Sequence, residues 1–216
     1  MLELGYRLAS EEHGPNELVR FAGLAEEHGF AFALISDHFH PWTDRQGQSP
    51  FVWSVIGAIA HSTRRLELGT AATCPTMRVH PAIVAQAAAT AARKAGGGRK
   101  PRYGELTVCW GRDEAKARQA AWERWPTAAM ESSLSWELPL PAHFEAVAEL
   151  VTEDEVGKYE VCGPDPKRQL EAIQKYADAG YNHVCVHQVG PDQAGFMEFY
   201  AAEIFPRLRS HRRKAA

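Results

Sequence analysis

The sequence predicts an α/β protein built on a parallel sheet with helical cover. Three observations lead to this prediction. Short apolar or alternating segments that fit strands recur along the chain, and segments with apolar residues three or four positions apart lie between them. The connecting segments are short, and glycine and proline fall at the segment ends. Repeated strand–helix units of this kind build parallel sheets with helices packed on their faces.

Five segments fit strands of this sheet. They are residues 2–8, 32–36, 66–70, 104–110 and 183–187. A sixth, weaker candidate is residues 160–162. A closed barrel of parallel strands needs eight and typically takes about 250 residues. Five strands in a chain of 216 residues therefore predict an incomplete barrel.

Between the strands, apolar residues recur at the three- and four-residue intervals of a helix. The expected helices are residues 15–28, 50–61, 81–95, 113–125, 142–150, 166–179 and 193–208. Pro81 opens the third helix and the triple glycine 96–98 ends it, as is usual for proline and glycine. Between Trp125 and Tyr159 strand signals are missing, and Thr152 with Glu155 forms a capping box.

Composition and charge limit the classes of function that the protein can have. Hydrophobic residues make up 45% and charged residues 24%, which is ordinary for a globular domain. The net charge, 24 minus 27 or −3, disfavours a nucleic-acid partner. No apolar run approaches the roughly 20 residues of a membrane span, and no leader pattern is visible. The four cysteines form no CxxC pair and fit buried, reduced thiols. We expect one cytoplasmic domain over residues 1–216, without a nucleic-acid or membrane partner.

Residues that can carry chemistry follow the second strand directly, in the run Ser-Asp-His-Phe-His-Pro-Trp at 36–42. Functional sites of parallel α/β proteins lie at the carboxyl ends of the strands. His38 could exchange a proton near neutral pH, because the ordinary histidine pKa is about 6.5. Asp37 could orient it or bind a ligand. The pair also fits a helix-capping or solvent-exposed role, and both interpretations stay open at this point.

The spacing of His38 and His40 raises the question of a metal site. Two residues apart, they would lie on one side of an extended chain. Zinc needs three or four ligands, and Asp37, Asp44 and the distant Cys74 are the available candidates. We therefore expect no metal.

The segment after the third strand, residues 69–76, consists mainly of small residues. These residues could admit a flat ligand close to the backbone, or they could pack a tight layer of the barrel.

These motifs together resemble a known family, the luciferase-like (bacterial luciferase superfamily) oxidoreductases. Within it they are similar to the branch that uses the deazaflavin coenzyme F420, such as the F420-dependent glucose-6-phosphate dehydrogenases. The resemblance rests on residues 36–42, 68–70, 75–82, 180–187 and 205–209. It implies a TIM-barrel-derived fold, here reduced to about five parallel strands.

The resemblance also implies that the middle of the barrel is missing. Near residues 92–98 the chain passes from the third βα unit into the end of the sixth. Three units of about 30–35 residues amount to roughly a hundred residues. The expected division is units 1–3 over 1–92, a junction at 93–103 and the C-terminal units over 104–212. In the family, the absent part supplies a Gly-Thr-Gly-Glu segment with a proposed acid and the loops that hold the cofactor phosphate.

The resemblance implies roles for three residues that follow the second strand. Asp37 stands where the family contacts the deazaflavin. His38 stands at the position of the proposed base, which removes the proton of the substrate hydroxyl group. Trp42 corresponds to the indole that lies over the substrate.

Further roles follow for the segment after the third strand. Ala71 and Ala72 stand where the family has a non-prolyl cis peptide that supports the cofactor face. Cys74 stands where the glucose-6-phosphate dehydrogenases have threonine. Tyr159, beside Lys158, stands near their substrate-phosphate arginine, so glucose 6-phosphate is disfavoured as the substrate.

The implied activity is hydride transfer between an alcohol or hemiacetal carbon of a small substrate and coenzyme F420, with His38 taking the hydroxyl proton. One alternative is an FMN-dependent monooxygenase of the same superfamily. Another is a shortened barrel that folds or oligomerises without turnover. Open strand edges invite pairing between chains, so we expect a homo-oligomer.

Overall fold

The computed structural model describes residues 2–71, 73, 82–83, 86, 102–130, 134 and 137–208. Within these residues the core is one parallel sheet of six strands in the order β3-β2-β1-β6-β4-β5. The strands are β1 (Glu3–Leu8), β2 (Phe32–Ser36), β3 (Glu67–Ala71), β4 (Tyr103–Cys109), β5 (Val161–Cys162) and β6 (His183–Gln188). The predicted parallel α/β architecture is confirmed, and the five predicted strands correspond to β1–β4 and β6.

The order of the strands in the sheet differs from their order along the chain, which the sequence did not predict. β6 lies between β1 and β4, although β5 precedes it along the chain. β5 pairs only with Val108 and Cys109 at the end of β4. It is therefore a short addition at the carboxyl end of the sheet, and the weak candidate at 160–162 marks its position.

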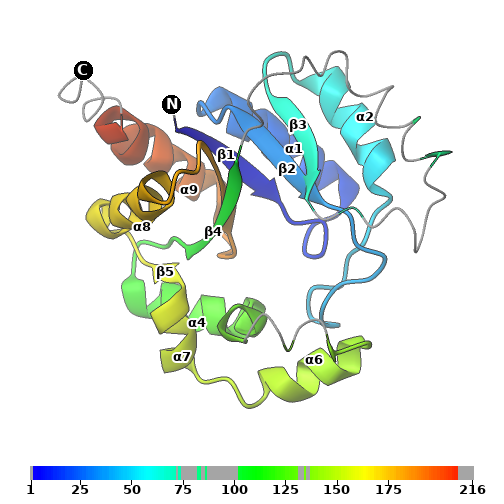
Figure 1. Cartoon of the computed structure of the whole chain (residues 1–216), viewed down its shortest axis with the longest axis vertical. Helices are drawn as coiled ribbons and strands as arrows, with labels where there is room; N and C mark the ends of the chain where they lie inside the picture. The colour runs from blue at the N-terminus through cyan, green and yellow to red at the C-terminus, as the bar shows by residue number, and fades with distance from the viewer. Residues whose placement is uncertain are drawn as a thin grey trace.

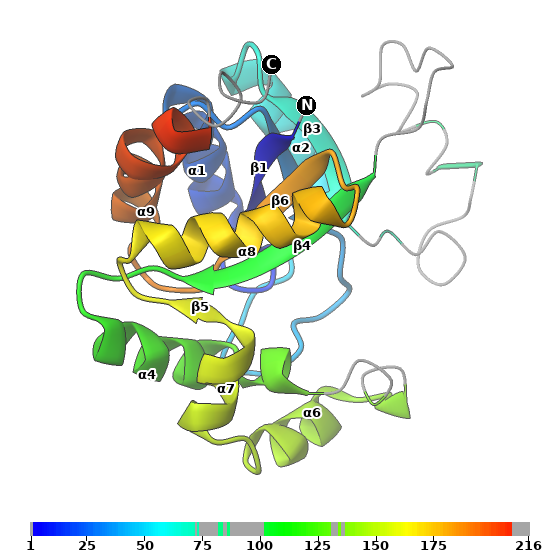
Figure 2. The ribbon, with the colours of Figure 1, turned by 60° about the vertical axis from the view of Figure 1, so that its left-hand side comes forward.

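The described helices form two groups. They are α1 (Pro15–Glu27), α2 (Val52–Ser62), α4 (Glu114–Arg124), α6 (Pro141–Ala148), α7 (Glu153–Tyr159), α8 (Pro166–Asp178) and α9 (Gln193–Phe199). Helices α1, α2, α8 and α9 accompany the sheet (Figure 1), whereas α4, α6 and α7 lie together to one side of it (Figure 2). We call helices α4, α6 and α7 together the α4–α7 layer. Among the described residues, no helix has the length and apolar character needed to cross a bilayer.

Among the described residues, the helix predictions hold with two differences. The capping box is present, since Thr152 and Glu155 exchange hydrogen bonds and start α7, which follows α6 as a separate helix. The expected helix 193–208 changes to a π-helical turn at Tyr200–Ile204. The expected helix 81–95 lies outside the described residues apart from 82–83 and 86.

The main core lies between the sheet and helices α1, α2, α8 and α9. Successive side chains of β1 alternate between the two faces of the sheet, and the outward ones, Leu4, Tyr6 and Leu8, are buried. The ring of Phe30 stacks on that of Tyr200, with centroids 5.8 Å apart. Full burial of a large apolar side chain contributes about 1.5–3 kcal/mol, so this layer fixes the strands whose ends carry the site.

The inner face of the sheet is closed at the amino ends of the strands by two rings. The Phe32 ring lies directly on Gly5, where an added Cβ would be 2.1 Å from it. Towards β4, Phe32 meets the Tyr103 ring edge-on, with centroids 5.4 Å apart. Tyr103 remains 43% exposed, and every residue of β3 is at least partly exposed. The inner face is therefore accessible from the β3 and β4 sides.

Candidate functional site

Polar residues at the carboxyl ends of β1 and β2 form one buried cluster. Parallel neighbours end at the same edge of a sheet, so Glu11 after β1 and His38 after β2 meet there. The Nε2 atom of His38 lies 3.3 Å from Oε1 of Glu11. Ser36 donates a hydrogen bond to the other oxygen of Glu11, and Ser10 donates to the Ser36 carbonyl over 2.6 Å. Glu11 is fully buried, so its carboxylate is fixed against the imidazole.

The environment of His38 favours the neutral imidazole. Burial is the main cause that lowers its pKa, and the Arg7 guanidinium lowers the pKa further. The carboxylates of Glu11 and Asp37 act in the opposite direction, but the pKa stays below its ordinary value. At neutral pH the imidazole of His38 can therefore accept a proton. The carboxylate of Glu11 would stabilise the imidazolium that forms.

Trp42 forms one wall of this cluster. Its ring meets the His38 ring edge-on, with centroids 4.9 Å apart, and the Phe144 ring of α6 at 5.0 Å. The side-chain oxygen of Gln46 accepts hydrogen bonds from the backbone N–H groups of Trp42 and Thr43, over 2.9 and 3.3 Å. The α4–α7 layer thus packs against the loop that carries His38 and holds Trp42 over it.

The remaining predicted site residues lie close by or outside the described part of the chain. Asp37 follows β2 and is 8% exposed. Ala71 ends β3 and pairs with Ser36 of β2, so it lies at the same edge of the sheet. Ala72 and Cys74 lie outside the described residues, and so does the predicted cis peptide bond between Ala71 and Ala72.

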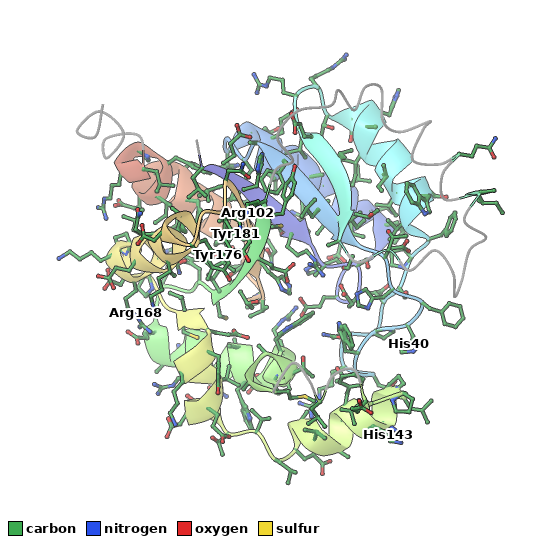
Figure 3. The ribbon with its side chains drawn as sticks, viewed as in Figure 1. His40, Arg102, His143, Arg168, Tyr176 and Tyr181 are labelled. Atoms are coloured by element: carbon green, nitrogen blue, oxygen red, sulfur yellow. The ribbon has the colours of Figure 1, made fainter. Side chains whose placement is uncertain are left out.

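His40 lies apart from the buried cluster. Figure 3 shows His40 on the loop that follows β2 and His143 on α6. His40 is exposed, and its Nδ1 atom is 2.8 Å from the carbonyl oxygen of Pro41. Within the described residues, no three or more histidine, cysteine or acidic side chains are placed to hold a metal ion.

A charged network on the inner face extends the cluster to β4 and β6, and sequence reasoning did not find it. Arg7 of β1 forms an ion pair with Glu105 of β4, and its second terminal nitrogen is 3.9 Å from Glu11. The Nδ1 atom of His187 lies 4.0 Å from Glu105, and burial lowers the pKa of His187 well below its ordinary value. Alternation along β1, β4 and β6 places these side chains inward, but only the strand order shows that they meet.

Comparison with known proteins shows which family and which proteins this chain is similar to. The family model described as luciferase-like monooxygenase matches residues 3–100. An F420-dependent glucose-6-phosphate dehydrogenase of Intrasporangium calvum is 26% identical over 333 residues, covering 97% of this chain and 99% of the relative. Its counterpart in Mycolicibacterium gilvum is 47% identical over 89 residues, which cover 41% of this chain and 26% of that protein.

Solved structures show the same fold. An F420-dependent secondary alcohol dehydrogenase in complex with an F420-acetone adduct aligns with a TM-score of 0.79 at 19% identity, over 94% of this chain and 98% of that chain. A coenzyme F420-dependent tetrahydromethanopterin reductase from Methanopyrus kandleri aligns with a TM-score of 0.68 at 16% identity, over 95% and 99%. The fold is therefore that of these TIM-barrel-derived structures, and residues 3–100 are similar to the luciferase-like family. Over nearly its whole length, the chain is similar to F420-dependent glucose-6-phosphate dehydrogenases that are longer than it is.

The shortening is internal. The alignment with the Intrasporangium calvum protein has 333 positions and this chain has 216 residues, so at least 333 minus 216, or 117, positions have no residue here. Because 97% of this chain and 99% of the relative fall within that alignment, these positions lie inside it. This length difference is similar in size to the roughly one hundred residues expected for three βα units.

Proposed function

We propose that this protein binds coenzyme F420 and transfers hydride between that cofactor and an alcohol or hemiacetal carbon of a small substrate. One observation carries the proposal: the neutral imidazole of His38 lies 3.3 Å from buried Glu11 at the carboxyl end of β2, with Trp42 beside it. The F420-dependent enzymes among the relatives and structural neighbours support the choice of cofactor.

In the oxidative direction, the substrate loses a hydride from carbon and a proton from its hydroxyl group, and a carbonyl product remains. Because Nε2 of His38 faces Glu11, the neutral ring keeps its proton there and accepts the substrate proton at Nδ1, and the carboxylate of Glu11 stabilises the imidazolium. A positioned base of this kind contributes about 10²- to 10⁴-fold in rate. The Trp42 ring shields the base and limits the substrate to one side of it.

The described residues at the strand ends fit a cofactor there. Asp37 and Ala71 lie at the ends of neighbouring strands, and the Ala72–Cys74 segment follows. The Thr73 hydroxyl and the Nε2 atom of His187 are buried without a hydrogen-bond partner among the described residues, as expected where a ligand completes the bonding. When bound, the deazaflavin ring supplies the hydride acceptor.

A second candidate is a protein that retains the fold without turnover. The absence of at least 117 positions of the relatives' length favours it, because those positions include part of the family's barrel. The two candidates differ in one property, the turnover of substrate.

The test is a fluorescence titration of the purified protein with oxidised F420, followed by turnover with a panel of small alcohols and sugars. Parallel titration with FMN separates the deazaflavin from the flavin alternative. Saturable F420 binding together with substrate-dependent loss of F420 absorbance supports the proposal. Saturable binding with no turnover over the panel favours the second candidate.

A further inference from the structure

One carboxylate oxygen of Glu11 faces two nitrogen-bearing side chains at once. Its Oε1 atom lies 3.3 Å from Nε2 of His38 and 3.9 Å from Nη2 of Arg7. The other oxygen of Glu11 already accepts a hydrogen bond from the Ser36 hydroxyl. The side chain of Glu11 is fully buried. The imidazole of His38 and the guanidinium of Arg7 therefore compete for Oε1.

A guanidinium normally binds a carboxylate more strongly than a neutral imidazole does. A charge-assisted hydrogen bond of this kind is about 2.7–2.9 Å long, and the separation of Arg7 from Glu11, 3.9 Å, is longer. The Arg7 side chain is only 9% exposed, so solvent does not draw it away from Glu11. Another group must hold it at this distance.

That group is the carboxylate of Glu105 on β4. Nη1 of Arg7 donates a hydrogen bond to Oε2 of Glu105, whereas Nη2 is the nitrogen that faces Glu11. The guanidinium is planar and rigid, so a close contact at one terminal nitrogen limits the approach of the other. The contact with Glu105 is the closer of the two and keeps Arg7 out of hydrogen-bond distance of Glu11.

The neighbours of Glu105 fix its position. It pairs with Cys185 in the register of β4 and β6, and its carbonyl oxygen accepts a hydrogen bond from the Tyr176 hydroxyl of α8. Its Oε1 atom lies 4.0 Å from Nδ1 of His187. Burial lowers the pKa of His187 well below its ordinary value, so this ring is neutral and leaves the charge of Glu105 to Arg7.

Four charged or titratable groups act electrostatically on His38. They are Glu11, Arg7, Asp37 and His40. On the side of α6, His38 meets the ring of Trp42, which packs on that of Phe144, and neither ring carries a charge. Arg7 is the permanent cation among the four groups, and its contact with Glu105 connects His38 to β4.

We propose that Glu105 is a positioning residue that acts on the proposed base through Arg7. By holding Arg7 on the inner face of the sheet, it leaves Oε1 of Glu11 to Nε2 of His38. The partner of one imidazole nitrogen determines which nitrogen carries the proton, so the neutral ring keeps its proton at Nε2 and presents Nδ1 to the substrate. The inference rests on the proposed function only where it names His38 as the base.

The test is a nitrogen-15 NMR titration of the histidine rings in the protein without cofactor or substrate. The signals of His38 are those that disappear in His38→Asn, and in the wild type they should show a neutral ring protonated at Nε2. In Glu105→Gln, Arg7 is released and approaches Glu11. The midpoint of His38 should then fall by roughly half a pH unit, and the neutral ring should shift towards the form protonated at Nδ1.

A double-mutant cycle shows whether Glu105 acts through Arg7. Arg7→Gln should raise the midpoint of His38, because a neighbouring positive charge is lost. In the Arg7→Gln background, Glu105→Gln should have little further effect. The control is Glu198→Gln, which removes an exposed carboxyl group from α9 and should change neither the midpoint nor the tautomer of His38.

The proposal is overturned if Glu105→Gln leaves the midpoint and the tautomer of His38 unchanged, or if it shifts the midpoint equally with and without Arg7. The Glu105 side chain is 41% exposed, so its replacement should not prevent folding. If Arg7→Gln does not fold, the tautomer decides, because a direct effect of the Glu105 charge would move the midpoint alone. A failure to bind F420 would overturn the proposed function and would leave all of these readouts unaffected.

Discussion

The ring of Phe32 on β2 meets the ring of Tyr103 on β4 edge-on, at 5.4 Å between centroids, across two intervening strands of the sheet. This contact spans the inner face of the sheet at the amino ends of its strands. Glycine at position 5 makes it feasible, because the Phe32 ring occupies the space of a Cβ there.

Gly5→Ala should destabilise the protein. The new methyl group would lie 2.1 Å from the Phe32 ring, which packs against Tyr103 and has little room to move. Overpacking of this kind costs roughly 1–3 kcal/mol, measured as a lower midpoint in urea unfolding. Gly23→Ala is the control, since nothing lies within 4 Å of its added Cβ in α1. That change should be neutral or stabilising by up to about 1 kcal/mol. Equal effects of the two changes would contradict the packing argument.

His38→Asn should reduce turnover by about 10²- to 10⁴-fold, because the substrate hydroxyl group loses its base. Cofactor affinity should be unchanged, since the proposed cofactor contacts come from other residues. His40→Asn is the matched control, two residues away and exposed. A kinetic comparison of both variants at saturating cofactor checks this. Retention of full turnover by His38→Asn would show that another group takes the proton.

Glu11→Gln should lower the pKa of His38 further. Glu11 raises that pKa, in opposition to burial and Arg7, so its neutralisation leaves the lowering causes unopposed. Proton NMR of the His38 ring should show the midpoint at lower pH in the variant, and the acid limb of the pH–rate profile should move the same way. Asp44→Asn, on the exposed part of the same loop, is the control. A rise in the His38 midpoint would contradict the assigned pairing.

The protein should form a dimer or a larger assembly. β3 ends the sheet and has no further strand neighbour among the described residues, and β5 covers only the end of β4. Unpaired strand edges attract other chains unless they are protected. Light scattering coupled to size-exclusion chromatography gives the mass directly. A monomer of 23.9 kDa at all concentrations would contradict this prediction.

The local sequence pattern was sufficient to predict most strands and helices, and one part of the candidate site. Alternation and apolar runs placed the five long strands, and the Thr152 capping box marked the start of α7. The position of residues 36–42 after a strand predicted a polar cluster at the carboxyl end of the sheet, where His38 and Trp42 do meet.

The partners of His38 could not be predicted in the same way, because they depend on the register of distant strands. Glu11 reaches His38 only because β1 and β2 are parallel neighbours that end at one edge. Arg7 reaches Glu105 across β6, and no local pattern indicates that β6 separates β1 from β4.

The titration of the wild-type protein with oxidised coenzyme F420, read by fluorescence, tests the central claim most directly. The account predicts saturable binding in the micromolar range, with no comparable binding of FMN. Absence of F420 binding at high micromolar concentration would contradict it, and would mean that the loss of the middle βα units removed the cofactor site.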